Sequence, residues 1–323
     1  MPKKFRFGVV CGELQDGEQW GQYAHRVESL GYDRLLAPDT FSPDRPAAFP
    51  ALATAAQETR LRVGSYVCCT DYRHPVILAK EAATLNRLTG GRFELGLGPG
   101  NWIDDYQQAG ISFEPAGTRV SKFAESLHII KALLGKSGEE TVSYQGTYFT
   151  ITHMKGFSLP QQSPPAIFVG AGGKRMLSIA GREADIVGIA PITAKPNAGY
   201  GPTAFGIQLA NATDEPTLQK IAWVREAARD RFDSLELASP LFAVIPTNES
   251  EQVARRIAQN AQVSPEEVRS ALSFAIGTHE QIAETLWKRR ERYGISYIIV
   301  LDKDRETFAP IITLLKDWDQ SNT

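Results

Sequence analysis

A glycine-rich stretch with two adjacent cations, FVGAGGKRML at residues 168–177, has the composition of a phosphate-binding loop. An apolar run leads into glycines that expose backbone N–H groups, and a helical pattern begins directly afterwards. The N-terminal end of a helix attracts anions, and two cations there would add to that attraction. The candidate binding residues are Gly170, Ala171, Gly172, Gly173, Lys174 and Arg175. The alternative is a tight strand-to-helix turn with both cations in solvent.

Alternating glycines mark a second stretch, GGRFELGLGPGNW at residues 90–102. Its spacing differs from the dinucleotide fingerprint G-x-G-x-x-G, because Asn101 stands where the third glycine belongs. Glycine at every second position of a strand leaves one face without side chains, so another surface can approach closely. If Gly96, Gly98 and Gly100 face the interior of the fold, a flat ring could lie there with Asn101 and Trp102 beside it. The alternatives are that these glycines relieve crowding and that Trp102 fills the core.

Motifs for metal binding and nucleophilic catalysis are not found in the sequence. The five histidines lie in separate segments without HxH or HExxH spacing, so no metal site is expected. No GxSxG motif occurs. Cys68 and Cys69 are adjacent in an apolar run. Cysteines in such a run are more often packed side chains of a strand than catalytic nucleophiles. The three cysteines are expected to be reduced thiols.

The elements that must position these residues alternate between short apolar runs and longer amphipathic patterns. The runs with strand character are 5–10, 33–38, 61–68, 92–98, 166–171, 184–190, 235–245 and 296–301. Between them, apolar residues recur every three or four positions in helical stretches such as 18–31, 74–90 and 121–135. Eight strand–helix repeats in 323 residues predict an α/β fold, a (β/α)8 TIM barrel.

Residues just after the strands are the candidates for acid–base chemistry, because active sites of TIM barrels lie at the C-terminal ends of the strands. The candidates are Glu13, Asp39, Cys68 and His74. Asp39 is the preferred proton donor, because burial favours the protonated form of a carboxyl group. Its alternative role is that of a cap or turn residue that bonds nearby backbone.

Three segments exceed a minimal barrel and are expected as insertions at its C-terminal rim. Residues 143–156 have the aromatic alternation of a β-hairpin, 191–216 are rich in Pro, Gly and Ala, and 246–278 contain helical patterns. No linker-like change of composition divides the chain, so residues 1–323 are expected to form a single domain.

Charge and hydropathy favour a small-molecule substrate. The formal net charge is −2 and no run of five basic residues occurs, so neither nucleic acid nor a membrane surface is an expected partner. The sequence contains no apolar stretch of signal-peptide length near its start and no run of eighteen apolar residues, so a cytoplasmic location is expected.

Three segments together resemble the bacterial luciferase-like superfamily. They are DRLLAPDTFSP (33–43), RLRVGSYVCCTDYRHPVILAKEAATLNRLTGGRFELGLGPGNW (60–102) and FVGAGGKRMLSIAGREADIVGI (168–189). Within that superfamily, the chain is most similar to the branch of oxidoreductases that use the deazaflavin coenzyme F420, and YGISYIIVLDKDRETFAPII near the C-terminus fits that branch.

The resemblance implies a barrel that holds a flavin or deazaflavin ring at its C-terminal mouth. The ring would lie against the third and fourth strands, beside Ser65, Val67 and Cys68, with a non-prolyl cis peptide bond within 65–69. Asp39 matches the acidic position after the second strand, and 172–175 match the phosphate loop. Many relatives follow the acid with histidine, whereas this chain has Thr40, so no histidine acid is present at that position. Relatives are commonly dimers, so a homodimer is expected.

Three activities follow from this resemblance. The first is hydride transfer between F420 and a small organic substrate, with the protein supplying orientation and at most one proton. The second is an FMNH2-dependent monooxygenase, with FMN as the alternative cofactor. The third is a non-catalytic flavin-binding protein, which the missing histidine after Asp39 keeps open.

Overall fold

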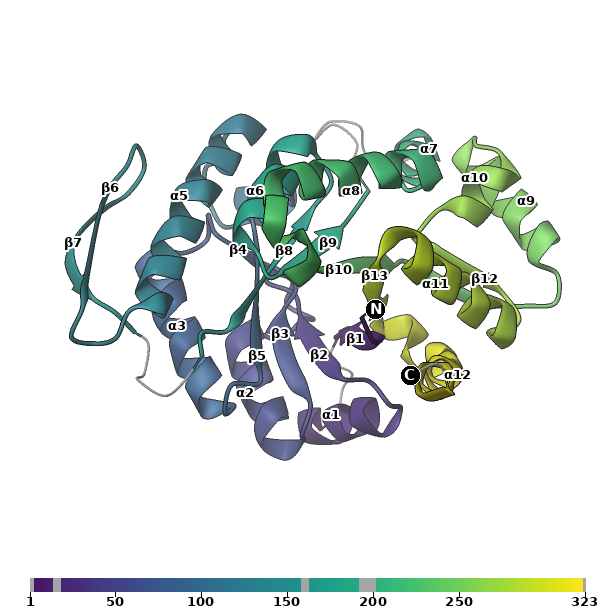
Figure 1. Cartoon of the computed structure of the whole chain (residues 1–323), viewed down its shortest axis with the longest axis horizontal. Coiled ribbons are helices and arrows are strands. Elements are labelled where there is room, and N and C mark those ends of the chain that lie inside the picture. The colour runs from purple at the N-terminus through teal and green to yellow at the C-terminus, as the bar shows by residue number, and fades with distance from the viewer. Residues whose placement is uncertain (1–2, 14–18, 158–162, 192–201, 322–323) are drawn as a thin grey trace. The chain divides into compact units, whose positions relative to one another are not determined.

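A computed structural model of the chain describes residues 3–13, 19–157, 163–191 and 202–321 (Figure 1). The described chain separates into two compact units. Unit 1 comprises Met1–Gly12, Arg26–Arg34 and Gly170–Thr323, and unit 2 comprises Glu13–His25 and Leu35–Val169. The single-domain expectation stays a prediction.

Four parallel strands form the centre of unit 1, in the order β1-β13-β10-β9. The strands are β1 (Arg6–Val10), β9 (Ile186–Ile189), β10 (Glu236–Leu241) and β13 (Ile295–Leu301). The helices of this unit include α6 (Lys174–Glu183), α8 (Asp214–Ala228), α11 (His279–Tyr293) and α12 (Arg305–Ser321), with short 3-10 turns at Arg229–Ser234 and Asp302–Asp304. Phe7, Tyr297 and Phe308 are fully buried, so the apolar runs read from the sequence supply the core of this unit.

Unit 2 is built around β5 (Phe93–Gly98), which pairs in parallel with β3 (Arg62–Ser65), β4 (Cys68–Cys69) and β8 (Ala166–Ala171). Strand β2 (Arg34–Ala37) lies next to β3. The helices are α2 (Ala48–Glu58), α3 (Pro75–Leu88), α4 (Ile103–Gln108) and α5 (Ala116–Gly135); α1 (Trp20–Ser29) begins in unit 2 and ends in unit 1. Every residue of β5 is buried, which explains its nearly continuous apolar sequence.

The predicted (β/α)8 barrel is confirmed, with β1, β2, β3, β5, β8, β9, β10 and β13 as its parallel strands. Two predicted strands are interrupted. The run 61–68 divides into β3 and β4, because the chain leaves the strand geometry at a cis peptide bond between Tyr66 and Val67. The run 235–245 divides into β10 and β11 (Ala243–Pro246).

The segments expected as insertions have defined structures where the chain is described. The hairpin is confirmed as the antiparallel strands β6 (Thr141–Gln145) and β7 (Thr150–Lys155), next to α5 in Figure 1. The segment 246–278 contains α9 (Ser250–Ala261) and α10 (Pro265–Ser270), and also a strand that was not predicted, β12 (Phe274–Gly277), which pairs with β11. Of 191–216, residues 192–201 lie outside the described residues, and α7 (Pro202–Ala210) follows them.

Candidate active site

The glycines of β5 face protein atoms. A Cβ on Gly96 would lie 2.0 Å from the backbone oxygen of Ser65, and one on Gly98 would lie 2.8 Å from Cγ2 of Val67. Gly100 has φ +75°, and a Cβ there would lie 2.0 Å from the hydroxyl oxygen of Tyr106. These contacts support the alternative in which the glycines relieve crowding. The binding of a ring by Gly98, Gly100 and Asn101 stays a prediction.

The atoms that crowd Gly96 and Gly98 belong to Ser65, the last residue of β3, and to Val67, in the short segment that joins β3 to β4. The expected non-prolyl cis peptide bond is confirmed in this segment, at Tyr66–Val67. Ser65 fastens this segment to β5, because its hydroxyl donates to the oxygen of Gly96 and accepts from the Gly96 nitrogen, both at 2.9 Å. The close approach of the two backbones requires glycine at 96. Gly96 and Gly98 therefore leave the room in which the segment with the cis peptide bond packs against β5.

Asp39, two residues after the end of β2, has a carboxylate that accepts several hydrogen bonds. Its two oxygens accept hydrogen bonds from the Arg73 guanidinium at 2.7 and 2.8 Å, and Oδ2 also accepts from the backbone nitrogen of Cys69 at 3.0 Å. Its side chain is 8% exposed. Arg73 also lies 3.5 Å from Glu81. This geometry supports the alternative of a residue that bonds backbone, here the strand that follows the cis peptide bond.

The other three acid–base candidates differ in their exposure to solvent and in their contacts. Cys68 is fully buried, and burial raises the pKa of its thiol, so it keeps its proton as expected for a packed strand residue. His74 is exposed and caps α3, with Nδ1 accepting from the Val76 nitrogen at 3.3 Å and its ring edge-on to Phe149. Glu13 is exposed and precedes residues that are not described.

Two acidic residues outside the predicted site, Asp105 and Asp71, bind side chains around α4. Asp105 accepts hydrogen bonds from Thr40 and Tyr72, each at 3.3 Å. Asp71 accepts from the Tyr106 hydroxyl at 3.1 Å and lies 3.7 Å from the ammonium of Lys122. The signal available in the sequence for Asp105 was the acidic pair Asp104 and Asp105 in the first turn of α4, and Asp71 follows the third apolar run.

Trp102 does not fill the core. It is the residue before α4 and is 54% exposed, so that alternative is wrong. The loop that precedes it is held from both sides. The Tyr106 hydroxyl lies 3.4 Å from the oxygen of Pro99, and Arg119 donates to the oxygen of Gly100 at 3.3 Å. Trp102 thus stands on a loop whose backbone is fixed.

The predicted phosphate loop in unit 1 has the expected local structure. Strand β8 ends at Ala171, Gly173 is the N-cap of α6 without a side-chain capping bond, and the helix begins at Lys174. A Cβ on Gly173 would meet no atom within 4 Å. Lys174 and Arg175 are exposed in the first turn, with the Lys174 ammonium 6.0 Å from the ring centre of Trp223. The loop therefore has open space, helix N–H groups and two cations at one position.

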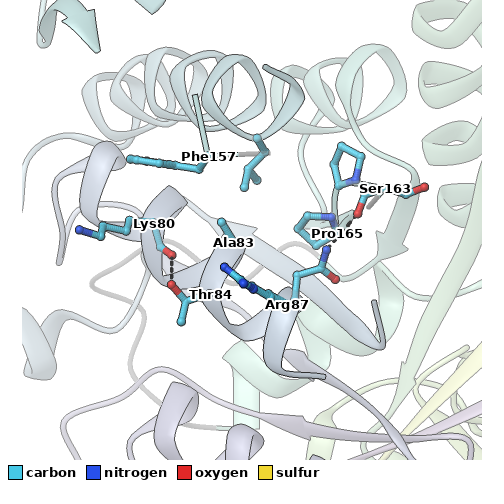
Figure 2. A pocket seen from close by; sticks show the side chains of 10 residues that line it. Lys80, Ala83, Thr84, Arg87, Phe157, Ser163 and Pro165 are labelled. Carbon is cyan, nitrogen blue, oxygen red and sulfur yellow. Dashed lines mark hydrogen bonds between the residues drawn. The ribbon is translucent and has the colours of Figure 1, made fainter. Parts of the chain in front are cut away.

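The described residues offer no metal site. They include no group of three or more His, Cys, Asp or Glu arranged to hold a metal ion. None of the described helices is long and apolar enough to cross a membrane. A cavity of about 180 Å3 lies in unit 2 between α3, α5 and the residues before β8 (Figure 2), and no predicted site residue lines it.

Comparison with known sequences identifies relatives with two kinds of name. The chain is 28% identical over 190 residues to an F420-dependent glucose-6-phosphate dehydrogenase of Amycolatopsis mediterranei (strain U-32), over 55% of this chain and 56% of the relative. It is 37% identical over 163 residues to a 4-hydroxyprotoasukamycin monooxygenase of Streptomyces nodosus subsp. asukaensis, over 46% and 42%. The chain thus spans about half the length of the curated relatives it matches.

Solved structures with the same fold extend over almost the whole chain. An F420-dependent secondary alcohol dehydrogenase in complex with an F420–acetone adduct aligns over 97% of this chain and 99% of its own, with a TM-score of 0.73 and 16% identity. An EDTA monooxygenase from Chelativorans sp. BNC1 aligns over 98% and 94%, with a TM-score of 0.73 and 14% identity. The sequence profile of the family described as luciferase-like monooxygenase matches residues 6–296. The chain belongs to this luciferase-like family.

Proposed function

We propose that this protein is an oxidoreductase that binds coenzyme F420 and transfers hydride between it and a small organic substrate. The observation that carries the proposal is the open, doubly cationic N-terminus of α6. It occurs in a family member whose sequence relatives include F420-dependent dehydrogenases. The coenzyme carries phosphate, which the donor set at this helix end suits.

The residues of the loop fit such a group. Gly173 leaves open space where a side chain would stand, and its oxygen accepts from Leu177, so the helix is regular from its first turn. The backbone N–H groups of the first turn have no partners within the helix and are available to phosphate oxygens. Lys174 and Arg175 would add charge-assisted hydrogen bonds to the phosphate. Gly170, Ala171 and Gly172 lead from the end of β8 to the helix and would lie beside the phosphate.

Unit 2 supplies the residues that we assign to the ring and the substrate. Bound F420 would supply a carbon atom that accepts or donates hydride. Arg73 and Asp39 fix the backbone at Cys69, and Ser65 fixes the segment that contains the cis peptide bond. Preorganisation of this kind lowers the barrier by holding reactants in place. For the proton we favour exposed Glu13 or His74 over bonded Asp39 and buried Cys68.

Titration of the purified protein with F420 and FMN, followed by fluorescence, tests the proposal. We expect F420 to bind at micromolar or lower concentration, with substrate-dependent reduction or oxidation of the bound coenzyme. Binding of FMN with no binding of F420 would overturn it. Gel filtration with light scattering measures on the same sample whether the expected homodimer forms.

An FMNH2-dependent monooxygenase is the second candidate. It is favoured by the 37% identity to a relative named as a monooxygenase. Oxygen consumption that depends on both reduced FMN and substrate would support it. If bound coenzyme of either kind is never turned over with any substrate, the chain is a flavin-binding protein without catalysis.

A further inference from the structure

Two large aromatic side chains are exposed at the C-terminal end of the strands in unit 2. Phe41 follows β2 and is 47% exposed, and Trp102 follows β5 and is 54% exposed. We call this pair the aromatic wall. Large apolar side chains exposed beside a candidate site are a common sign of ligand contact, since they gain free energy when a partner covers them.

Asp105 holds one half of the wall in place. Its carboxylate accepts from the backbone nitrogen of Phe41 at 3.4 Å, from the Thr40 hydroxyl at 3.3 Å and from the Tyr72 hydroxyl at 3.3 Å. The Tyr72 ring packs against Phe41 with 4.6 Å between ring centres. Burial raises the pKa of Tyr72, so its hydroxyl keeps the proton that it donates. Phe41 is therefore fixed before any ligand arrives, which reduces the entropy cost of binding.

Three cations on the elements around the wall are engaged by protein groups. Arg73 is bonded to Asp39, and Lys122 lies beside Asp71. Arg119 donates to two backbone oxygens and stacks over the ring of Phe113. The three cations are thus engaged, whereas Asp104 is exposed in the first turn of α4 next to the wall. An anion placed here would meet negative charge without a free cation among these three.

We infer that the aromatic wall takes an uncharged substrate with an aromatic or flat apolar group, and that Asp105 is the positioning residue of this contact. The inference rests on the proposed function only for the identity of the reaction. It separates this chain from the relatives named as glucose-6-phosphate dehydrogenases, whose named substrate is an anion. A flat group stacked on Phe41 or Trp102 would gain the geometry that aromatic pairs prefer.

Saturation-transfer NMR and calorimetry test the inference with two probes, 1-phenylethanol and glucose 6-phosphate, on F420-loaded and cofactor-free protein. We expect saturation of the phenyl protons and binding of 1-phenylethanol in preference to glucose 6-phosphate. Phe41→Ala and Trp102→Ala should each raise the Kd for 1-phenylethanol about fivefold or more, in line with the loss of one aromatic contact. Leu88→Ala is the matched control, because Leu88 is 56% exposed at the far end of α3, and should leave the Kd unchanged.

Asp105→Asn tests the positioning role, since the amide keeps the volume of the carboxyl group. We expect a two- to fivefold higher Kd that disappears when Phe41 is already alanine; a purely structural effect would add to that of Phe41→Ala. Preferential binding of glucose 6-phosphate, binding of neither probe, or a Kd insensitive to Phe41 and Trp102 would overturn the inference. If F420 fails to bind while 1-phenylethanol binding still depends on Phe41, only the proposed function is overturned.

Discussion

The two glycine-rich segments of this protein use glycine for opposite purposes. In β5 of unit 2, a Cβ on Gly96 would collide with backbone at 2.0 Å, so the missing side chain makes room for the protein itself. At the start of α6 in unit 1, a Cβ on Gly173 would meet nothing within 4 Å. The missing side chain there leaves space that a ligand can use. Glycine alone therefore does not indicate a binding site; the atoms around it decide.

Gly96→Ala should give the largest effect on stability. The added methyl group collides with the oxygen of Ser65, and neither backbone can move without breaking the pairing of β3 with β5. We expect a loss of about 3 kcal/mol in the free energy of unfolding, measured by urea denaturation. Gly173→Ala is the paired control and should change it by less than about 1 kcal/mol. An equal loss of stability in the two variants would contradict the conclusion that glycine is required at position 96 but not at position 173.

Arg73→Met should destabilise unit 2 nearly as much, because it leaves the carboxylate of Asp39 buried without its bidentate partner. We expect about 2 kcal/mol by urea denaturation. Arg255→Met breaks an exposed pair with Glu251 and should cost less than about 0.5 kcal/mol. If the double variant Asp39→Asn/Arg73→Met lost the full sum of the single effects, the pair would not be coupled.

Lys220 gives unit 1 a buried cation that, unlike Arg73, has no ion pair among the described residues. It is 2% exposed, donates to the oxygen of Asn211 at 2.5 Å, and burial lowers its pKa to about 8. The unfolded chain keeps the proton up to the ordinary value of 10.5, so stability should rise as the pH increases from about 8 to 10.5.

The size of this gain can be measured against a variant without the amine. Relative to Lys220→Met, the wild type should gain about 2 kcal/mol in the free energy of unfolding between pH 7 and pH 9.5. Lys288→Met, at an exposed position, should show no such difference. A pH-independent difference between wild type and Lys220→Met would contradict the burial of a titrating amine.

The smallest expected effect concerns ligand binding at the open glycine segment. Lys174→Gln/Arg175→Gln should weaken F420 binding about tenfold, or about 1.4 kcal/mol, with little change in stability because both side chains are exposed. Arg182→Gln, in the last turn of the same helix, is the control. Unchanged F420 affinity in the double variant would show that the α6 N-terminus does not hold the phosphate.

The periodicity of apolar residues in the sequence was sufficient to predict the (β/α)8 barrel. All eight predicted runs contain strands, and the hairpin at 143–156 was recognised from alternation and turn residues. Strand β12 was not predicted because the segment 246–278 was interpreted from its helical patterns, and the strand occupies only Phe274–Gly277 near the end of that segment. The break between β3 and β4 was expected only from the family resemblance, since the residues 65–69 carry no local signal for a cis peptide bond.

By itself the sequence determined the order of the barrel strands and their helices and the family, because these follow from local patterns and motif spacing. The tertiary structure alone decided what those residues contact. It joined Asp39 to Arg73 and Cys69, filled the space over Gly96 and left the space over Gly173 open. It also brought Asp105 to Thr40, Phe41 and Tyr72, which lie 33 to 65 positions away in the chain. Such contacts depend on how strands and loops pack in space, which no spacing within a single segment encodes.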